Sequence, residues 1–163
     1  MNPSQTERYS RQIKLPQVGK IGQQQLLDAR VLIIGMGGLG SPVSMYLAAA
    51  GVGHLVISDY DRVDESNLQR QIVHTQASIN ELKATSARDT LLRLNPAVSV
   101  DALNYELDDE ELREQVTQAD VVVDCTDNFP SRFELNRISL ATGTPVVSGA
   151  AIRWEGQVST FIP

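Results

Sequence analysis

Residues 31–51 read VLIIGMGGLGSPVSMYLAAAG, and this stretch decides the fold class. Its apolar start, residues 31–35, predicts a short buried strand that ends in glycine. Ser41 and Pro42 predict a helix with serine as its N-cap and proline at its first position. That helix should end at Gly51, because glycine suits a helix C-cap. A strand, a glycine-rich turn and a helix in this order are typical of a parallel α/β sheet.

Strands and helices alternate along the rest of the chain. Apolar runs predict the strands, and apolar spacings of three and four residues, as over residues 84–94, predict the helices. Because parallel strands need crossover connections, we expect a Rossmann-like, doubly wound and mostly parallel sheet with helices on both faces. A single domain over residues 1–163 would combine a helical arm (1–29) with this core (30–163). The predicted strands are 54–58, 98–103, 120–126, 144–150 and 157–162, and the predicted helices are 80–94, 108–116 and 130–141.

Composition excludes several classes of protein. The chain has 163 residues, 14 Lys and Arg, and 20 Asp and Glu, for a net charge of −6. This acidic balance argues against duplex nucleic acid as a partner, because binding phosphate backbones needs a basic face. With one cysteine and two histidines we expect no disulfide framework, no zinc site and no histidine-based catalysis. Cys125 should be a small core residue, and Trp154 should be packed.

Targeting and membrane segments are not expected. No run of about 18 apolar residues is present. The first 20 residues are polar and lack the basic-then-apolar layout of a signal peptide. These features favour a reduced, cytoplasmic compartment.

The glycine loop predicts a nucleotide site. Residues Gly35–Gly40 fit G-x-G-x-x-G between a strand and a helix, which is the context that the motif requires. Glycine lets the backbone approach a phosphate, and the N–H groups at a helix start attract anions. Asp59 ends the next strand, where a carboxylate can accept a ribose hydroxyl. The alternative for the glycine loop is a tight turn without a ligand, and the alternative for Asp59 is a solvated acidic side chain.

Cations near the predicted strand ends favour a triphosphate over a dinucleotide. Residues 66–71, SNLQRQ, are rich in amide and guanidinium donors, and Lys83 follows. A nucleoside triphosphate carries a charge of about −4 and needs Arg, Lys and usually Mg²⁺ around it. Arg70 and Lys83 could supply the positive charge. Asp127, just beyond a strand end, could hold Mg²⁺, or it could cap the helix at Pro130.

The ordered set of motifs resembles the bacterial ThiF/MoeB/HesA adenylyltransferases, which are relatives of the ubiquitin-activating enzymes. The match covers essentially the whole chain, and the set is far more specific than the glycine loop alone. The motifs that carry the resemblance are Arg8–Gln12, Gly35–Gly40, Ser66–Gln71, Lys83, Asp124–Asn128 and Gly149–Ala151.

The resemblance implies adenylation of a protein carboxylate. ATP and Mg²⁺ would bind, and the C-terminal Gly-Gly end of a ubiquitin-like sulfur-carrier protein would be activated with release of pyrophosphate. Arg70, Lys83 and Asp127 would act in catalysis, Asp127 as the metal ligand, and Arg11 would complete the site of a partner in a homodimer. The nucleotide would contact Gly35, Gly37, Gly38, Asp59, Ser66, Asn67, Leu68, Gln69, Arg70, Lys83, Asp127 and Asn128.

The chain departs from the family in one respect, and two other classes of function stay open beside the adenylyltransferase. Family members generally continue beyond this point, so we expect the chain to correspond to their N-terminal part, without the Cys-x-x-Cys zinc sites. Thiamine and molybdopterin biosynthesis are both open as pathways. A nicotinamide-dependent oxidoreductase would also use the glycine loop and Asp59. A non-catalytic nucleotide-binding or dimerisation module is the third possibility.

Overall fold

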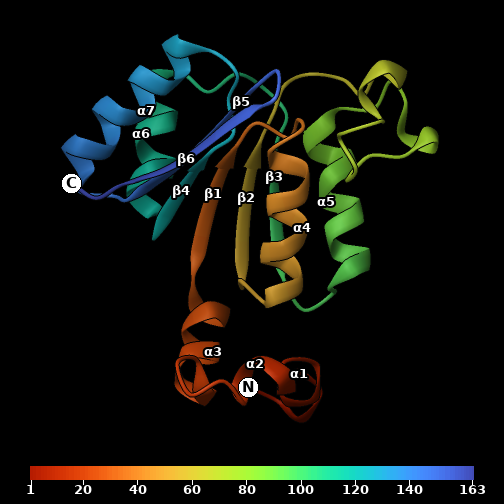
Figure 1. Cartoon of the computed structure of the whole chain (residues 1–163), viewed down its shortest axis with the longest axis vertical. Helices are drawn as coiled ribbons and strands as arrows, with labels where there is room; N and C mark the ends of the chain where they lie inside the picture. Colours follow the sequence, from red (N-terminus) through yellow and green to blue (C-terminus); the bar gives the residue numbers. More distant parts are fainter.

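A computed structural model describes all of residues 1–163 and contains one six-stranded sheet with the strand order β3-β2-β1-β4-β5-β6 (Figure 1). Neighbouring strands from β3 to β5 are parallel, and β6 is antiparallel to β5. Only Arg153 and Trp154 separate β5 from β6, which is too short for a crossover, so the two form a hairpin. The Rossmann-like fold class is confirmed. The strands are β1 Arg30–Ile34, β2 His54–Ser58, β3 Ser99–Leu103, β4 Val121–Asp124, β5 Val146–Ile152 and β6 Glu155–Phe161.

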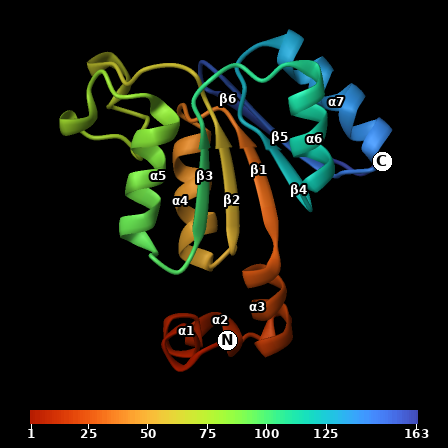
Figure 2. The same ribbon diagram turned by 180° about the vertical axis from the view of Figure 1, so that it is seen from behind.

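Helices cover both faces of the sheet (Figures 1 and 2). Because side chains alternate along a strand, Val31 and Ile33 of β1 pack towards α4 and α5, while Leu32 packs towards α6 and α7. None of the helices combines the length and the apolar character needed to cross a bilayer. The helices are α1 Pro3–Arg8, α2 Ser10–Ile13, α3 Gly19–Asp28, α4 Gly40–Ala50, α5 Lys83–Leu94, α6 Asp109–Gln118 and α7 Phe129–Thr142, with short 3₁₀ turns η1 Glu65–Asn67 and η2 Gln76–Ser78.

The start of α4 differs from the prediction. The helix begins at Gly40, so Ser41 and Pro42 lie inside its first turn and the predicted serine cap is wrong. The reason is that the glycine loop already turns helically: the Ser41 backbone N–H donates to the Gly37 carbonyl at 2.9 Å. The C-cap at Gly51 is confirmed, with the left-handed φ of 88° that glycine tolerates.

The other predicted elements are present, with ends that differ by up to three residues. Helix α5 begins at Lys83 because Asn80 has a φ of 71° and Leu82 pairs with Arg62 in an extended bridge. Trp154 is fully exposed at the tip of the β5–β6 hairpin, so the expectation that it is packed is wrong. In a two-residue hairpin turn the side chain has no neighbouring element above it.

The N-terminal arm lies at the end of the sheet opposite the carboxyl ends of the parallel strands (Figure 1). Tyr9 is buried, and its hydroxyl accepts a hydrogen bond from the Asn95 amide at 2.8 Å. The side chains of Gln12 and Gln23 both donate to the Ala50 carbonyl, at 3.1 and 3.0 Å. The arm is therefore attached to the chain's own core through the C-terminal end of α4.

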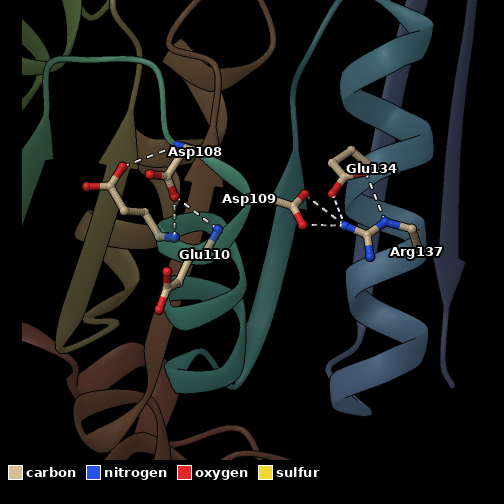
Figure 3. Close-up of polar contacts among 6 residues, drawn as sticks. Asp108, Asp109, Glu110, Glu134 and Arg137 are labelled. Atoms are coloured by element: carbon tan, nitrogen blue, oxygen red, sulfur yellow. Dashed lines mark hydrogen bonds and ion pairs between the residues drawn. The ribbon is translucent and has the colours of Figure 1, made fainter.

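Helices α6 and α7 are joined by polar contacts on the other face (Figure 3). Asp108 caps α6 by accepting from the backbone N–H groups of Glu110 and Glu111 at 3.0 and 2.9 Å. Arg137 of α7 donates to Asp109 at 2.8 Å and also pairs with Glu134. The carboxylates of Glu134 and Asp109 raise the pKa of the Arg137 guanidinium above its ordinary value. These contacts orient α7, whose first turns reach the carboxyl edge of the sheet.

Candidate functional site

A cleft of about 1300 Å³ lies at the carboxyl edge of the parallel strands. It extends from the glycine loop to the start of α7 and the β5–β6 hairpin. This is where an open α/β sheet binds its ligands. Of the predicted site residues, Arg11 and Ser66–Gln69 do not line the cleft, and those that do are Gly35, Gly37, Gly38, Asp59, Arg70, Lys83, Asp127 and Asn128.

The glycine loop is closed tightly on itself at its ends and open in its middle. Gly35 has a φ of 93°, and a Cβ added there would lie 2.8 Å from the Cys125 carbonyl oxygen. A Cβ on Gly40 would lie 1.9 Å from the Gly35 carbonyl oxygen. At Gly37 and Gly38, by contrast, the nearest atoms are side-chain atoms at 3.6 and 3.5 Å. The middle of the loop therefore leaves room for a ligand to approach the backbone.

Asp59 ties the glycine loop to the end of β2. Its carboxylate accepts from the Met36 backbone N–H at 2.8 Å and from the Asp61 backbone N–H at 2.9 Å. Only one of these bonds reaches each oxygen, and each oxygen can accept another. The side chain remains half-buried in the cleft wall. It can thus accept a hydroxyl hydrogen bond from a ligand while holding the loop.

Two cations lie on this half of the cleft. Lys83 is the first residue of α5, and its side chain is only 8% exposed. Its ammonium group donates to the Asp61 carboxylate at 3.0 Å, which provides a counter-ion for the buried charge. Arg70 is exposed and lies against the loop, with its Cγ and Cδ 3.5 Å from a Cβ built on Gly38. Positive charge therefore borders the open middle of the glycine loop.

The segment before Arg70 is held by a chain of side-chain hydrogen bonds. Asp64 accepts from the Ser66 hydroxyl at 2.5 Å, and this bond, with one from the Ser66 backbone, lowers the pKa of the Asp64 carboxyl. The Asn67 amide donates to Ser66 at 3.0 Å and accepts from Gln71 at 2.8 Å. Gln71 is buried beside Gly37, and sequence reasoning did not place it in the site. The chain of bonds fixes the turn that presents Arg70.

Acidic residues at the end of β4 differ in what they can do. Asp124 is buried and accepts from the Thr126 hydroxyl at 2.7 Å and the Ser148 hydroxyl at 2.7 Å, so it is occupied within the protein. Asp127 is exposed in the cleft and has no hydrogen bond or ion pair. Asn128 caps α7 by accepting from the Ser131 N–H at 3.0 Å, so the alternative that Asp127 caps this helix is wrong.

Asp127 is suited to hold Mg²⁺ together with a nucleotide. The chain has no cluster of three or more His, Cys, Asp or Glu side chains that could hold a metal ion by themselves. Mg²⁺ commonly binds through one or two protein carboxylates, phosphate oxygens and waters. A free carboxylate in the same cleft as Arg70 and Lys83 fits that arrangement, with the remaining ligands coming from phosphate and water.

Arg132 is a cleft residue that sequence reasoning missed. One nitrogen of its guanidinium donates to the Thr126 carbonyl at 2.6 Å and the Gly149 carbonyl at 3.0 Å. A signal was available in the sequence, because Arg132 lies near the start of a helix, where the dipole disfavours positive charge. A cation at such a position indicates a role other than helix stabilisation.

The remaining titratable groups near the loop are structural. Burial, assisted by the charge of Asp124, raises the pKa of the Cys125 thiol to about 12, which opposes a nucleophilic role. The two ring nitrogens of His74 contact the Met36 carbonyl and the Ser86 hydroxyl, both at 3.0 Å. Burial lowers the pKa of His74, so its ring is neutral at pH 7 and supports the glycine loop.

The parallel sheet, the glycine loop and the cleft at its carboxyl edge together define a Rossmann-like α/β protein. The ThiF family model matches residues 9–163, and the chain belongs to the ThiF family. It is 50% identical over 154 residues to the molybdopterin-synthase adenylyltransferase of Escherichia coli K12, covering 94% of this chain and 62% of the relative. It is 47% identical over 163 residues to the sulfur carrier protein ThiS adenylyltransferase of the same strain, covering 100% and 65%. The chain thus spans less than two thirds of these relatives.

Solved structures share the fold. A crystal structure of Escherichia coli MccB with AMPCPP and MccA superposes with a TM-score of 0.85 at 25% identity, covering 97% of this chain and 49% of that chain. A structure of MccB with ATP superposes with a TM-score of 0.75 at 28% identity, covering 80% and 39%. The family resemblance seen in the sequence motifs is confirmed.

Proposed function

We propose that this chain adenylates the C-terminal glycine of a ubiquitin-like sulfur-carrier protein, with ATP bound in the cleft. The observation that carries the proposal is that Arg70, Lys83 and Asp127 line one cleft with the glycine loop. The names of the two curated relatives support a sulfur-carrier substrate, and the MccB structure with ATP supports ATP as the nucleotide. The carrier belongs to thiamine or molybdopterin biosynthesis.

The proposed reaction needs charge stabilisation and positioning rather than a general base. A C-terminal carboxylate is already ionised at pH 7. One of its oxygens forms a bond to the α-phosphorus, the bond from that phosphorus to the bridging oxygen breaks, and pyrophosphate leaves with the electron pair. The products are an acyl-adenylate and pyrophosphate. The barrier is the approach of one anion to another, which cations and fixed geometry lower.

Each half of the cleft has a part in the proposal. Gly38 and Asp59 hold the nucleoside, with Gly35 and Gly37 giving the backbone room to approach. Asp127 holds Mg²⁺, which when bound neutralises phosphate charge and stabilises the leaving group. Arg70 and Lys83 bind phosphates, and Asn128 lies beside the nucleotide. Ser66, Asn67, Leu68 and Gln69 lie outside the cleft, so their part is to form the turn that presents Arg70.

The proposal includes a homodimer. Arg11 is exposed on α2. Helix α2 lies at the end of the sheet opposite the carboxyl edge of the strands (Figure 1), and the cleft lies at that edge. An arginine there cannot contact a nucleotide in the same chain without detachment of the arm. We place it instead at the cleft of a second copy, where its charge adds to that of Arg70 and Lys83.

The test is ATP–pyrophosphate exchange with two purified sulfur-carrier proteins, one from thiamine and one from molybdopterin biosynthesis. Arg70→Ala and Lys83→Ala should each reduce the exchange rate by about 10²-fold or more, because each removes a cation from the polyphosphate. Arg93→Ala, on the exposed last turn of α5, is the matched control and should leave the rate unchanged.

Other outcomes separate the alternatives. Wild-type exchange rates in both cleft variants would contradict the proposal. ATP binding by calorimetry without exchange for either carrier would instead indicate a non-catalytic nucleotide-binding module. Binding of NAD without Mg²⁺, with no competition from ATP, would indicate an oxidoreductase.

A further inference from the structure

The cleft has a third cation in addition to Arg70 and Lys83. Arg132 lines it from the start of α7, between the ends of β4 and β5. Its position differs from that of the other two, which border the glycine loop from the β2 side. The cleft therefore has positive charge on both sides of the place where the phosphates of the proposed ATP would lie.

The charge of Arg132 is not neutralised within the protein. Lys83 has Asp61 at 3.0 Å, but no carboxylate lies within 4.0 Å of the Arg132 guanidinium. The acid nearest in sequence on its own helix, Glu134, is paired with Arg137. A half-buried cation without a counter-ion in a ligand cleft favours an anionic ligand.

The guanidinium also has donors to spare. It carries five N–H groups, and the two bonds to the Thr126 and Gly149 carbonyls both use the same terminal nitrogen. The Nε and the other terminal nitrogen have no protein partner, and neither is among the buried unsatisfied atoms. Two carbonyls hold the group in place, so little further ordering is needed when a carboxylate binds.

The position of Gly149 links Arg132 to the nucleotide loop. The Gly149 carbonyl accepts from Arg132, and a Cβ built on Gly149 would lie 3.4 Å from the Leu39 side chain of the glycine loop. Beyond this contact the hairpin wall of the cleft includes Ala150, Ala151 and Gly156, which have little or no side chain, followed by the larger side chains of Ile152, Glu155 and Gln157. An extended chain that ends in glycine could lie along this wall with its carboxylate at Arg132.

We propose that Arg132 binds the C-terminal carboxylate of the incoming carrier protein and holds it beside the α-phosphate. This assignment rests on the proposed function. It makes Arg132 a substrate-binding residue for the acceptor, whereas Arg70 and Lys83 serve the nucleotide. A charge-assisted hydrogen bond from a free guanidinium nitrogen, Nε or Nη1, to the carboxylate is the interaction that this geometry offers.

The experiment compares carriers that end in a carboxylate with the same carriers made with a C-terminal carboxamide. Wild-type protein should bind the carboxylate form at least about 10-fold more tightly, as expected for loss of a charged hydrogen bond. Arg132→Gln should abolish this preference and raise the carrier KM in pyrophosphate exchange by about 10- to 100-fold. Its Kd for ATP measured without carrier should stay within about twofold of wild type.

Two further variants keep the test decisive. Arg93→Ala, on the exposed last turn of α5 and outside the cleft, should change neither the carboxylate preference nor the carrier KM. Arg132→Lys keeps the charge but lacks the planar guanidinium that the two carbonyls hold in place, and should lose part of the preference. If Arg132→Gln does not fold, Arg132→Lys is measured with the same readouts, and an unchanged preference in it overturns the proposal.

The failure of this assignment and of the proposed function are distinguishable. Two outcomes would overturn the role of Arg132 and leave the proposed function standing. One is equal binding of both carrier forms by wild type, and the other is a loss of ATP affinity in Arg132→Gln without a change in its carrier KM. Absence of exchange in wild type would contradict the proposed function. In that case the carboxylate and carboxamide binding comparison, which requires no turnover, still decides on Arg132.

Discussion

Single glycines in the loop after β1 meet very different surroundings. Gly40 faces backbone, since an added Cβ would lie 1.9 Å from the Gly35 carbonyl oxygen. Gly37 faces the Gln71 side chain at 3.6 Å, which is an ordinary contact. Of these two positions, only Gly40 therefore needs a glycine for the loop to close, although both belong to the same sequence motif.

Gly40→Ala and Gly37→Ala should consequently affect different properties, the first the stability of the fold and the second the binding of ATP. Gly40→Ala should lower the free energy of unfolding by about 1–3 kcal/mol, because backbone must move to admit the methyl group. Gly37→Ala should change it by less than about 0.5 kcal/mol, yet weaken ATP binding, because its methyl group occupies space open to a phosphate. Urea unfolding and calorimetric titration with ATP measure the two effects. Equal destabilisation by both would show that the loop closure depends on more than this contact.

His74 predicts a pH dependence of stability. Burial lowers its folded-state pKa below the ordinary value of 6.5, so the unfolded chain binds the proton more readily. The stabilisation is complete above pH 6.5 and is lost as the pH falls below it. Between pH 7.5 and 5.5 the wild type should lose at most about 1.4 kcal/mol from this group, the limit reached if the ring stays neutral throughout in the folded state. His74→Gln should lack this component, which thermal unfolding at both pH values checks, and an identical loss in both proteins would contradict the assignment.

Among the helices, α6 and α4 begin in different ways. At α6 the local sequence supplies the cap, because Asp108 and Glu111 satisfy each other's backbone N–H groups. At α4 no side chain caps the helix, and a loop carbonyl, that of Gly37, accepts from the first turn instead. The predicted serine cap of α4 is wrong because backbone closes that turn, whereas the capping side chains of α6 are local in sequence although no cap was predicted there.

Asp108→Ala should therefore destabilise the protein by about 1 kcal/mol, since two backbone donors of α6 lose their acceptor. For a chain of this length that corresponds to a fall in Tm of about 2–4 °C. Asp108→Ser retains a capping oxygen and should recover most of the loss. A serine variant as unstable as the alanine variant would show that the loss comes from the charge of Asp108 rather than from its capping oxygen.

Across the whole molecule, the arm lies at the end of the sheet opposite the carboxyl ends of the parallel strands (Figures 1 and 2), and the cleft lies at those carboxyl ends. The arm is docked through buried Tyr9, so Arg11 is held on a defined surface rather than on a free tail. In the proposed homodimer this surface meets the cleft of the other copy. The arrangement makes each site a product of two chains.

Mixing two inactive variants tests that arrangement. Arg11→Ala and Asp127→Ala should each be nearly inactive alone, but their mixed dimers contain one site with both residues intact. Random exchange of subunits should restore about a quarter of the wild-type exchange rate, since half the dimers are mixed and each has one good site. Exchange rates after unfolding and refolding the mixture measure this. No recovery in a mixture shown to contain mixed dimers, or a monomer in sedimentation, would contradict the proposed role of Arg11.

The sequence by itself determined the features that depend on neighbours along the chain. The apolar run before Gly35 and the left-handed cap at Gly51 are local, and they were predicted correctly. Alternation of strands and helices then indicated the parallel sheet and its ligand-binding edge, so Asp59 and Asp127 could be placed at the cleft before any coordinates were known.

Only the tertiary structure decided which distant groups meet. The pairing of Lys83 with Asp61, the two carbonyls that hold Arg132, and the exposure of Trp154 involve contacts, or their absence, between separate elements. Periodicity records which face of an element is apolar, because burial acts on every turn of a helix or pair of strand residues. Periodicity does not indicate which side chain of another element lies opposite a polar group, because that depends on how the whole sheet and its helices pack.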